Sequence, residues 1–100
     1  MIRVETWIRP HQIHAMKVAL RDSGASGFTA SDVSVLSAEA GVPSRVCVKL
    51  EAIVHDDRIE RLLAELARAG RPVGTGEIWL VRVVRAVRIG SGAIDEAAIA

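Results

Sequence analysis

The chain has 100 residues, which is enough for one domain but not for two independent hydrophobic cores. Half of the residues are apolar and a quarter are charged, which excludes a wholly disordered chain. The net charge of +1 does not indicate a protein that binds nucleic acid. The single cysteine, Cys47, excludes an intrachain disulfide. Because the sequence also has no signal-peptide pattern and no membrane-spanning apolar run, we expect a soluble, cytoplasmic protein.

The beginning of the chain predicts a strand followed by a helix. Residues 2–9 alternate between two sets of side chains with the period of two that is typical of a strand. Pro10 ends this pattern and suits the first turn of a helix, where its missing N–H is not needed. The helix is predicted to reach about residue 22, because apolar residues recur at helical spacing: Ile13, Met16 and Leu20.

The middle of the chain predicts two strands joined by a loop. The strands cover residues 27–36 and 45–54, and the loop covers residues 37–44, where glycine and proline interrupt the apolar pattern. The later strand has one continuous apolar face, which consists of Val46, Val48, Leu50, Ala52 and Val54. This alternation indicates a strand with one buried face.

The second half of the chain again predicts a helix followed by a strand. Asp57 and Glu60 have the spacing of a capping box, and an apolar stripe follows them: Ile59, Leu62, Leu63 and Leu66. Residues 70–76 predict a glycine-rich turn that ends the helix. A strand is predicted over residues 77–84 and a short fifth piece over residues 86–89.

The order β-α-β-β-α-β predicts an α+β fold, a ferredoxin-like sandwich in which two helices cover one face of an antiparallel sheet. One such domain accounts for residues 1–100. The strand over residues 77–84 is apolar on both faces, and a chain this short buries a second apolar sheet face most simply against copies of itself. We therefore expect an oligomer, with an edge strand that merely exposes apolar residues as the alternative.

Five segments, in this order, resemble the PII signal-transduction superfamily. They are VETWIRP at residues 4–10, DSGASGFT at 22–29, KLEAIVHDD at 49–57, GTGEIW at 74–79 and AVRIGSG at 86–92. The resemblance implies a homotrimer of ferredoxin-like subunits that binds ATP or ADP in clefts between neighbouring subunits. It also implies a regulatory protein, not an enzyme, that acts on an enzyme or transporter through the loop between the second and third strands.

The chain departs from the family at several positions. The loop at residues 37–44 is shorter, and there is no tyrosine for modification. Val35 and Ser37 replace glycines that approach the nucleotide. Glu77 replaces a lysine and Gly90 replaces an arginine near the phosphates. The sequence is thus identified as a divergent PII-like protein.

The resemblance implies a set of ligand-binding residues. These are Gly27 and Thr29 near the ribose and base, Trp7, Glu51 and Ile53 at the base, Ser37 at the start of the loop, and Gly74, Thr75, Gly76 and Arg88 at the phosphates. Glycines also let backbone N–H groups converge on an anion, although glycines between a helix and a strand often only make a turn. The alternatives are a core or interface role for Trp7 and an ion pair of Glu51 with Lys49 or Arg88.

The charge changes favour a ligand with few phosphates. Glu77 and Gly90 remove two positive charges from the phosphate end, and charge-assisted contacts dominate phosphate recognition. We therefore expect AMP or ADP in preference to ATP, unless other arginines substitute: Arg9, Arg45 or Arg71.

Two other functions remain open from the sequence. One is a trimeric interaction module without a nucleotide. The other is a sensor of a metal or of a small anion. His11 and His14, three residues apart on the first helix, are the basis for a metal. The resemblance to relatives with a short loop implies bicarbonate as a candidate anion. No third metal ligand has diagnostic spacing, so we predict no metal site. An enzyme is not expected, because no Ser-His-Asp or Cys-His pairing has a recognisable context.

Overall fold

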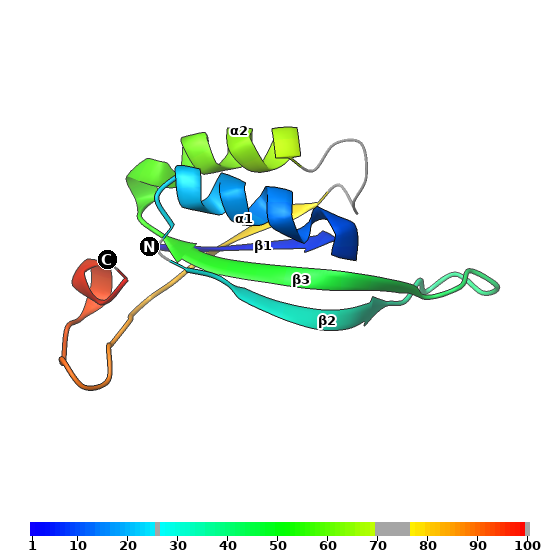
Figure 1. The fold of residues 1–100 in the computed structure, drawn as a ribbon. Coiled ribbons are helices and arrows are strands. Elements are labelled where there is room, and N and C mark those ends of the chain that lie inside the picture. Colours follow the sequence, from blue (N-terminus) through cyan, green and yellow to red (C-terminus); the bar gives the residue numbers. More distant parts are fainter. Residues whose placement is uncertain (26, 70–76, 100) are drawn as a thin grey trace.

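The computed structural model of the protein describes residues 1–25, 27–69 and 77–99 (Figure 1). Its helices and strands are β1 (Ile2–Ile8), α1 (Ile13–Asp22), β2 (Thr29–Val35), β3 (Arg45–Val54), α2 (Ile59–Ala69) and β4 (Ile78–Arg82). Short 3-10 turns at Pro10–Gln12 and Asp56–Arg58 lead into the two helices, and a third covers Asp95–Ala98. The predicted order β-α-β-β-α-β is confirmed. The predicted turn over residues 70–76 lies outside the described residues.

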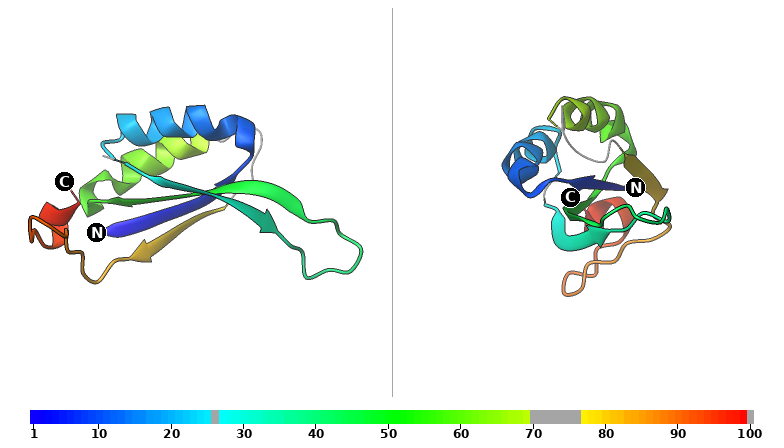
Figure 2. Two further views of the ribbon diagram at one scale, coloured as in Figure 1. Left: turned by 60° about the horizontal axis from the view of Figure 1, so that its bottom comes forward. Right: turned by 90° about the vertical axis from the view of Figure 1, so that its right-hand side faces the viewer.

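The four strands form one antiparallel sheet in the order β2-β3-β1-β4. Each β-α-β unit therefore encloses a strand of the other unit, which is the ferredoxin-like arrangement. Both helices lie on the same face of the sheet and leave the opposite face, here called the open face, without helices (Figures 1 and 2). The predicted fold class is confirmed.

The hydrophobic core lies between the helices and the sheet. Every second residue of the central strands points at the helices, as the cross-strand partners Val4 and Ala52 illustrate. The stripe predicted on α2 meets these residues, and Leu62 is fully buried. Burying one leucine side chain contributes about 2 kcal/mol, so this layer holds the sheet in place.

The hairpin of β2 and β3 extends beyond the helices (Figure 1). Val46 lies in its outer part, opposite Ser34, and is 65% exposed. The apolar face predicted for residues 45–54 is therefore buried only along the part that the helices reach. The short loop predicted over residues 37–44 joins the two strands.

The chain after β4 differs from the prediction. The strand expected over residues 77–84 ends at Arg82, and residues 86–89 form no strand, because Val87 makes only an isolated bridge to Ile94. The chain reverses between these two residues at Gly90 and Gly92, whose φ angles of 100° and 75° suit glycine. The C-terminal segment thus folds back near the start of β1 (Figure 2). The described part of the chain contains no helix with the length and apolar character needed to cross a membrane.

Candidate functional site

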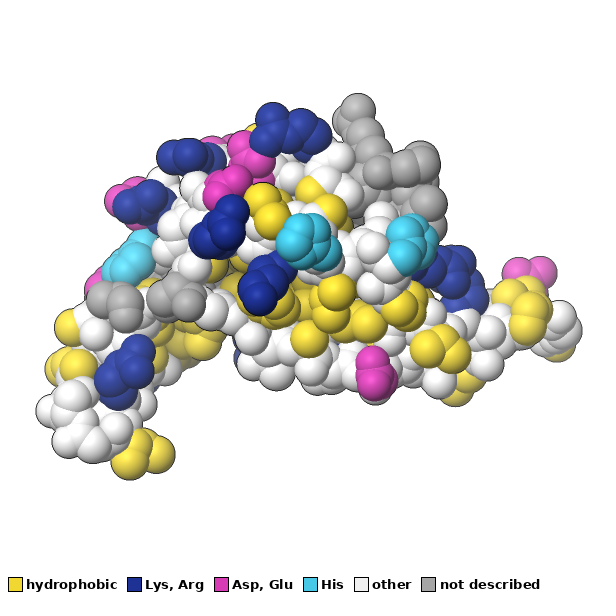
Figure 3. Space-filling model, viewed as in Figure 1, with side chains coloured by type: hydrophobic (Ala, Val, Ile, Leu, Met, Phe, Trp, Pro, Cys, Tyr) yellow, Lys and Arg dark blue, Asp and Glu magenta, His cyan; other side chains and the backbone are white. Residues whose placement is uncertain are grey.

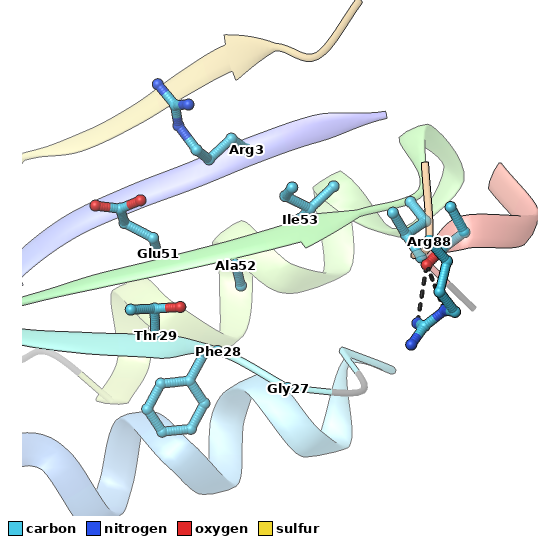
Figure 4. A pocket seen from close by; sticks show the side chains of 10 residues that line it. Arg3, Gly27, Phe28, Thr29, Glu51, Ala52, Ile53 and Arg88 are labelled. Carbon is cyan, nitrogen blue, oxygen red and sulfur yellow. Dashed lines mark hydrogen bonds between the residues drawn. The ribbon is translucent and has the colours of Figure 1, made fainter. Parts of the chain in front are cut away.

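The first cavity, here called the tail cavity, lies where the C-terminal segment meets the sheet (Figure 4). Its volume is about 360 Å³. Five residues of the predicted ligand set line it: Gly27, Thr29, Glu51, Ile53 and Arg88. Arg3, which is not in that set, also lines it. Positions as far apart in the sequence as Arg3 and Arg88 thus share one cavity.

The antiparallel register explains how the sheet collects these residues. Thr29 on β2 pairs with Glu51 on β3, and Arg3 on β1 pairs with Ile53 on β3. Paired residues point to the same face of a sheet, and residues two apart on one strand do so as well. All four side chains therefore belong to the open face, at the end where β1 and β2 begin.

Arg88 contributes a guanidinium group that already binds an oxygen atom. Its Nε and Nη2 donate hydrogen bonds to the carbonyl oxygen of Ala98 at 3.2 and 2.8 Å (Figure 4). The backbone N–H of Arg88 donates to Ala93 at 2.8 Å, and Gly92 donates to the carbonyl of Arg88 at 3.0 Å. The folded tail thereby fixes Arg88 at the cavity, where it recognises an acceptor of the kind that an anionic ligand also offers.

The second cavity, here called the tryptophan cavity, lies at the opposite end of the strands and has a volume of about 380 Å³. It is lined by Trp7, Ser34, Val35, Arg45, Glu77 and Trp79. The two indole rings form an edge-to-face pair with centroids 5.2 Å apart and an interplanar angle of 68°. Trp79 Nε1 donates to Glu77 Oε2 at 3.0 Å, and Lys49 Nζ lies 5.7 Å from the centroid of the Trp7 ring.

A network of ion pairs lies on the open face between the cavities. Glu5 is only 8% exposed at its side chain, and its Oε1 lies 2.9 Å from Arg3 Nε and 3.8 Å from Lys49 Nζ. Lys49 Nζ also lies 3.1 Å from Glu51 Oε1. The ion pair of Glu51 with Lys49 that the sequence offered as an alternative is therefore present. Glu51 lines the tail cavity and belongs to this network at the same time.

Two of the remaining predicted residues, Trp7 and Ser37, do not line the tail cavity. Trp7 lines the tryptophan cavity. Ser37 lies in the exposed loop, where its Oγ accepts a hydrogen bond from the N–H of Glu39 at 3.0 Å. Gly74, Thr75 and Gly76 lie outside the described residues. Within the described ranges, no group of three His, Cys, Asp or Glu side chains could hold a metal ion.

The structure adds lining residues that the resemblance did not imply. Arg3 lines the tail cavity, and Trp79 and Arg45 line the tryptophan cavity. The sequence identified Trp79 as an apolar strand residue and as the last residue of one resembling segment, and it named Arg45 only as one possible substitute cation. The strand alternation places Arg3 on the face of Glu5, but the neighbours of each side chain depend on the pairing of distant strands.

One titratable group near the start of β1 has a shifted pKa. The ammonium group of Met1 donates a hydrogen bond to Asp56 Oδ1 at 2.6 Å, and this contact lowers the pKa of Asp56 below its usual value. Arg82 Nη1 donates to the other carboxylate oxygen at 3.4 Å and lowers the pKa further. These contacts join the end of β4 and the 3-10 turn before α2 to Met1.

Comparison with known proteins gives one consistent result. The model of the family described as "Nitrogen regulatory protein P-II" matches residues 1–93. The nitrogen regulatory protein P-II of Haemophilus influenzae is 30% identical to this chain, and the alignment covers 99% of this chain and 100% of that protein. The protein of the same description from Synechocystis is also 30% identical, with the same coverage. That from Pyropia yezoensis is 28% identical over 89% of this chain and 91% of its own length.

Proposed function

This chain belongs to the nitrogen regulatory protein P-II family, and we propose that it binds an adenine nucleotide in clefts between the subunits of a homotrimer and so regulates a partner protein. Members of this family are signal-transduction regulators and not enzymes, which confirms the expectation of a non-enzymatic role. They bind small effector molecules such as adenine nucleotides. We further propose that the whole chain is one domain and that it acts in the cytoplasm.

The observation that carries the proposal is the division of the candidate residues between two cavities. Along β3, Glu51 of the tail cavity and Arg45 of the tryptophan cavity are six positions apart, which corresponds to about 20 Å. Trp79 lies nearer to Glu51, because both residues pair with Glu5. Within one subunit, the candidate side chains are thus divided between two separately lined cavities. In a cyclic trimer, the tail cavity of one subunit can face the tryptophan cavity of the next, because each interface joins two different surface patches. Each cavity would then form one wall of a complete site.

Exposed apolar residues on the C-terminal segment support subunit association. Val84 is 84% exposed and Ile89 is 98% exposed, and Val87 and Ile94 are also more than half exposed. A cluster of apolar side chains in water is typical of a surface that another protein covers. The tail that carries these residues also holds Arg88, so contacts between subunits at the tail would lie close to the tail cavity.

The charges at the two cavities support AMP or ADP in preference to ATP. Glu77 lines the tryptophan cavity together with Arg45, so one wall carries one negative and one positive group. The tail cavity adds Arg3 and Arg88, but Arg3 is paired with Glu5. A triphosphate carries more negative charge than this set of cations balances well.

The exposed hairpin end is the proposed contact for an enzyme or a transporter. The loop at residues 37–44 is exposed throughout, and apolar side chains gather at this end of the molecule (Figure 3). Leu36 is 75% exposed and Val42 is 47% exposed. Because the loop is short, it would dock on the surface of its partner and not reach into a deep site.

Isothermal titration with AMP, ADP and ATP tests the proposal. We expect saturable binding by the wild-type protein, a mass of three subunits by light scattering, and loss of at least tenfold in affinity for Arg88→Ala, since a charge-assisted contact would be removed. Arg21→Ala is the matched control, because Arg21 is exposed on α1 and, among the described residues, forms its ion pair with the neighbouring Asp22. The absence of heat with all three nucleotides, or equal affinity of the two variants, would contradict the proposal.

One observation favours a second candidate function, a trimeric interaction module without a nucleotide. The guanidinium of Arg88 already donates two hydrogen bonds to Ala98. A guanidinium group that already donates hydrogen bonds within its own chain gains less binding free energy from an added anion. Under this alternative the protein would still form trimers but would give no heat with any nucleotide.

A further inference from the structure

Both tryptophans of the chain line the same cavity. Trp7 is half-buried, whereas Trp79 keeps 53% of its surface exposed although it lies in a strand paired with β1. Large aromatic side chains bury much apolar area at binding surfaces. An exposed indole therefore has apolar area that a ligand or another subunit can still cover. Trp79 therefore stands out as a contact residue for something outside the described subunit.

The ring of Trp79 is held in place before any ligand binds. Its only polar atom, Nε1, donates to Glu77 Oε2, and its ring packs edge to face with Trp7. The backbone of Glu77 is itself fixed, because Thr6 Oγ1 donates to the Glu77 carbonyl oxygen at 2.9 Å. A side chain that is already ordered loses little rotamer freedom on binding.

The fixed ring presents a specific chemistry. Because the indole N–H is satisfied by Glu77, the exposed part of Trp79 offers mainly an aromatic surface to a ligand. Arg45 lines the same cavity and brings a guanidinium group. An aromatic surface beside a cation suits a planar heteroaromatic ring that carries an anionic group.

We propose that Trp79 is a stacking platform for the base of the bound nucleotide and that Glu77 is the positioning residue that holds its indole. This inference rests on the proposed function and deepens it. It also assigns Glu77 a different role from the one that the sequence alone suggests, which is a negative charge that repels phosphate. In the structure its carboxylate serves as the acceptor that orients an aromatic ring.

The experiment combines calorimetry with tryptophan fluorescence, and ADP is the probe. Trp79→Ala should weaken ADP binding about five- to a hundredfold, the range of base–aromatic stacking, and Trp79→Phe should retain part of the affinity. Trp7→Phe leaves Trp79 as the only tryptophan, so ADP should quench the emission of this variant directly. The two milder variants keep an aromatic ring at each position and do not depend on the alanine variant folding.

Two substitutions of Glu77 separate its charge from its role as an acceptor. Glu77→Gln and Glu77→Ala both remove the negative charge, but only glutamine keeps an oxygen that can accept from Trp79 Nε1. Any loss of repulsion toward phosphate is therefore common to both variants. We expect Glu77→Ala to bind ADP about two- to tenfold more weakly than Glu77→Gln, the range for loss of one hydrogen bond.

The outcomes distinguish failure of this inference from failure of the proposed function. If the wild-type protein binds ADP but Trp79→Ala binds equally well and the emission of Trp7→Phe does not change, the stacking role is overturned while nucleotide binding stands. Equal affinities of Glu77→Gln and Glu77→Ala would overturn the positioning role. If Trp79→Ala binds weakly only because it no longer forms the wild-type oligomer, Trp79 is an interface residue and the inference is wrong. If the wild-type protein gives no heat with ADP, the proposed function and this inference fall together.

Discussion

The two ends of the open sheet face are built in different ways. At the tail cavity, the functional cation Arg88 is held by main-chain groups, because the C-terminal turn supplies the carbonyl that it binds. At the tryptophan cavity, side chains hold one another, since Glu77 orients Trp79 and Trp79 packs on Trp7. One end is thus suited to an anionic group and the other to a planar ring. A ligand with both parts would contact both cavities, which different residues of the subunit line.

The largest effect on this arrangement is expected from Glu5, which lies between the two cavities. Glu5→Gln removes the carboxylate that balances Arg3 and Lys49, so Arg3 loses this partner while Lys49 keeps its ion pair with Glu51. Breaking a buried ion pair lowers the free energy of unfolding more than breaking an exposed one. Because Glu5 is buried but Arg3 and Lys49 are partly exposed, we expect the free energy of unfolding to fall by about 1–3 kcal/mol. Urea denaturation measures it, with Glu39→Gln in the exposed loop as control. Equal stabilities of these two variants would show that the network contributes nothing.

A smaller and more local effect is expected in the tail. Asp95 has a positive φ of 52°, and its Oδ1 accepts hydrogen bonds from Arg85 Nε at 3.1 Å and from the N–H of Ala86 at 3.3 Å. Asp95→Ala removes these acceptors, whereas Asp95→Asn keeps one and tolerates the same backbone conformation. Hydrogen exchange at the amide of Arg88 should accelerate about fivefold in the alanine variant and less in the asparagine variant. Unchanged exchange in both variants would mean that Asp95 does not hold the tail.

The smallest effect is expected from Asp56 and depends on pH. The hydrogen bond from the Met1 ammonium group, with help from Arg82, lowers the pKa of this carboxyl below its ordinary value in the folded protein. A carboxyl whose pKa is lower in the folded than in the unfolded state stabilises the folded protein at pH values above the unfolded-state pKa. This stabilisation is lost as the pH falls through the folded-state pKa. The stability difference between the wild type and Asp56→Asn should therefore be constant near neutral pH and shrink below about pH 4. A difference that does not vary with pH would contradict the assignment.

Local sequence patterns were sufficient for the fold. The alternation of residues 2–9 and 45–54 and the apolar stripe of α2 predicted the elements and the face that each one buries. The β-α-β-β-α-β order then left few arrangements for the strands. The end of β4 was harder to predict, because Val83 and Val84 continue the apolar pattern while the backbone turns toward the tail.

The candidate site could be predicted only in part. The resemblance identified Gly27, Thr29, Glu51, Ile53 and Arg88, which the structure brings together at the tail cavity. The contact between Arg88 and Ala98 has no local signal, since it depends on how the tail folds back. The pairing of Trp79 with Trp7 depends on the register of β1 with β4, two strands that are far apart in the sequence.

Mixed trimers test the central claim, that each site joins the tail cavity of one subunit to the tryptophan cavity of the next. Subunits carrying Arg88→Ala and subunits carrying Trp79→Ala would be unfolded together and refolded, and ADP binding would be measured by calorimetry. In a cyclic trimer, every mixed assembly contains one interface at which both walls are intact, so we expect wild-type affinity to return at about one site per mixed trimer although each variant alone binds ADP weakly. If the mixture binds no better than the separate variants, both walls of the site must come from the same subunit and the account is wrong.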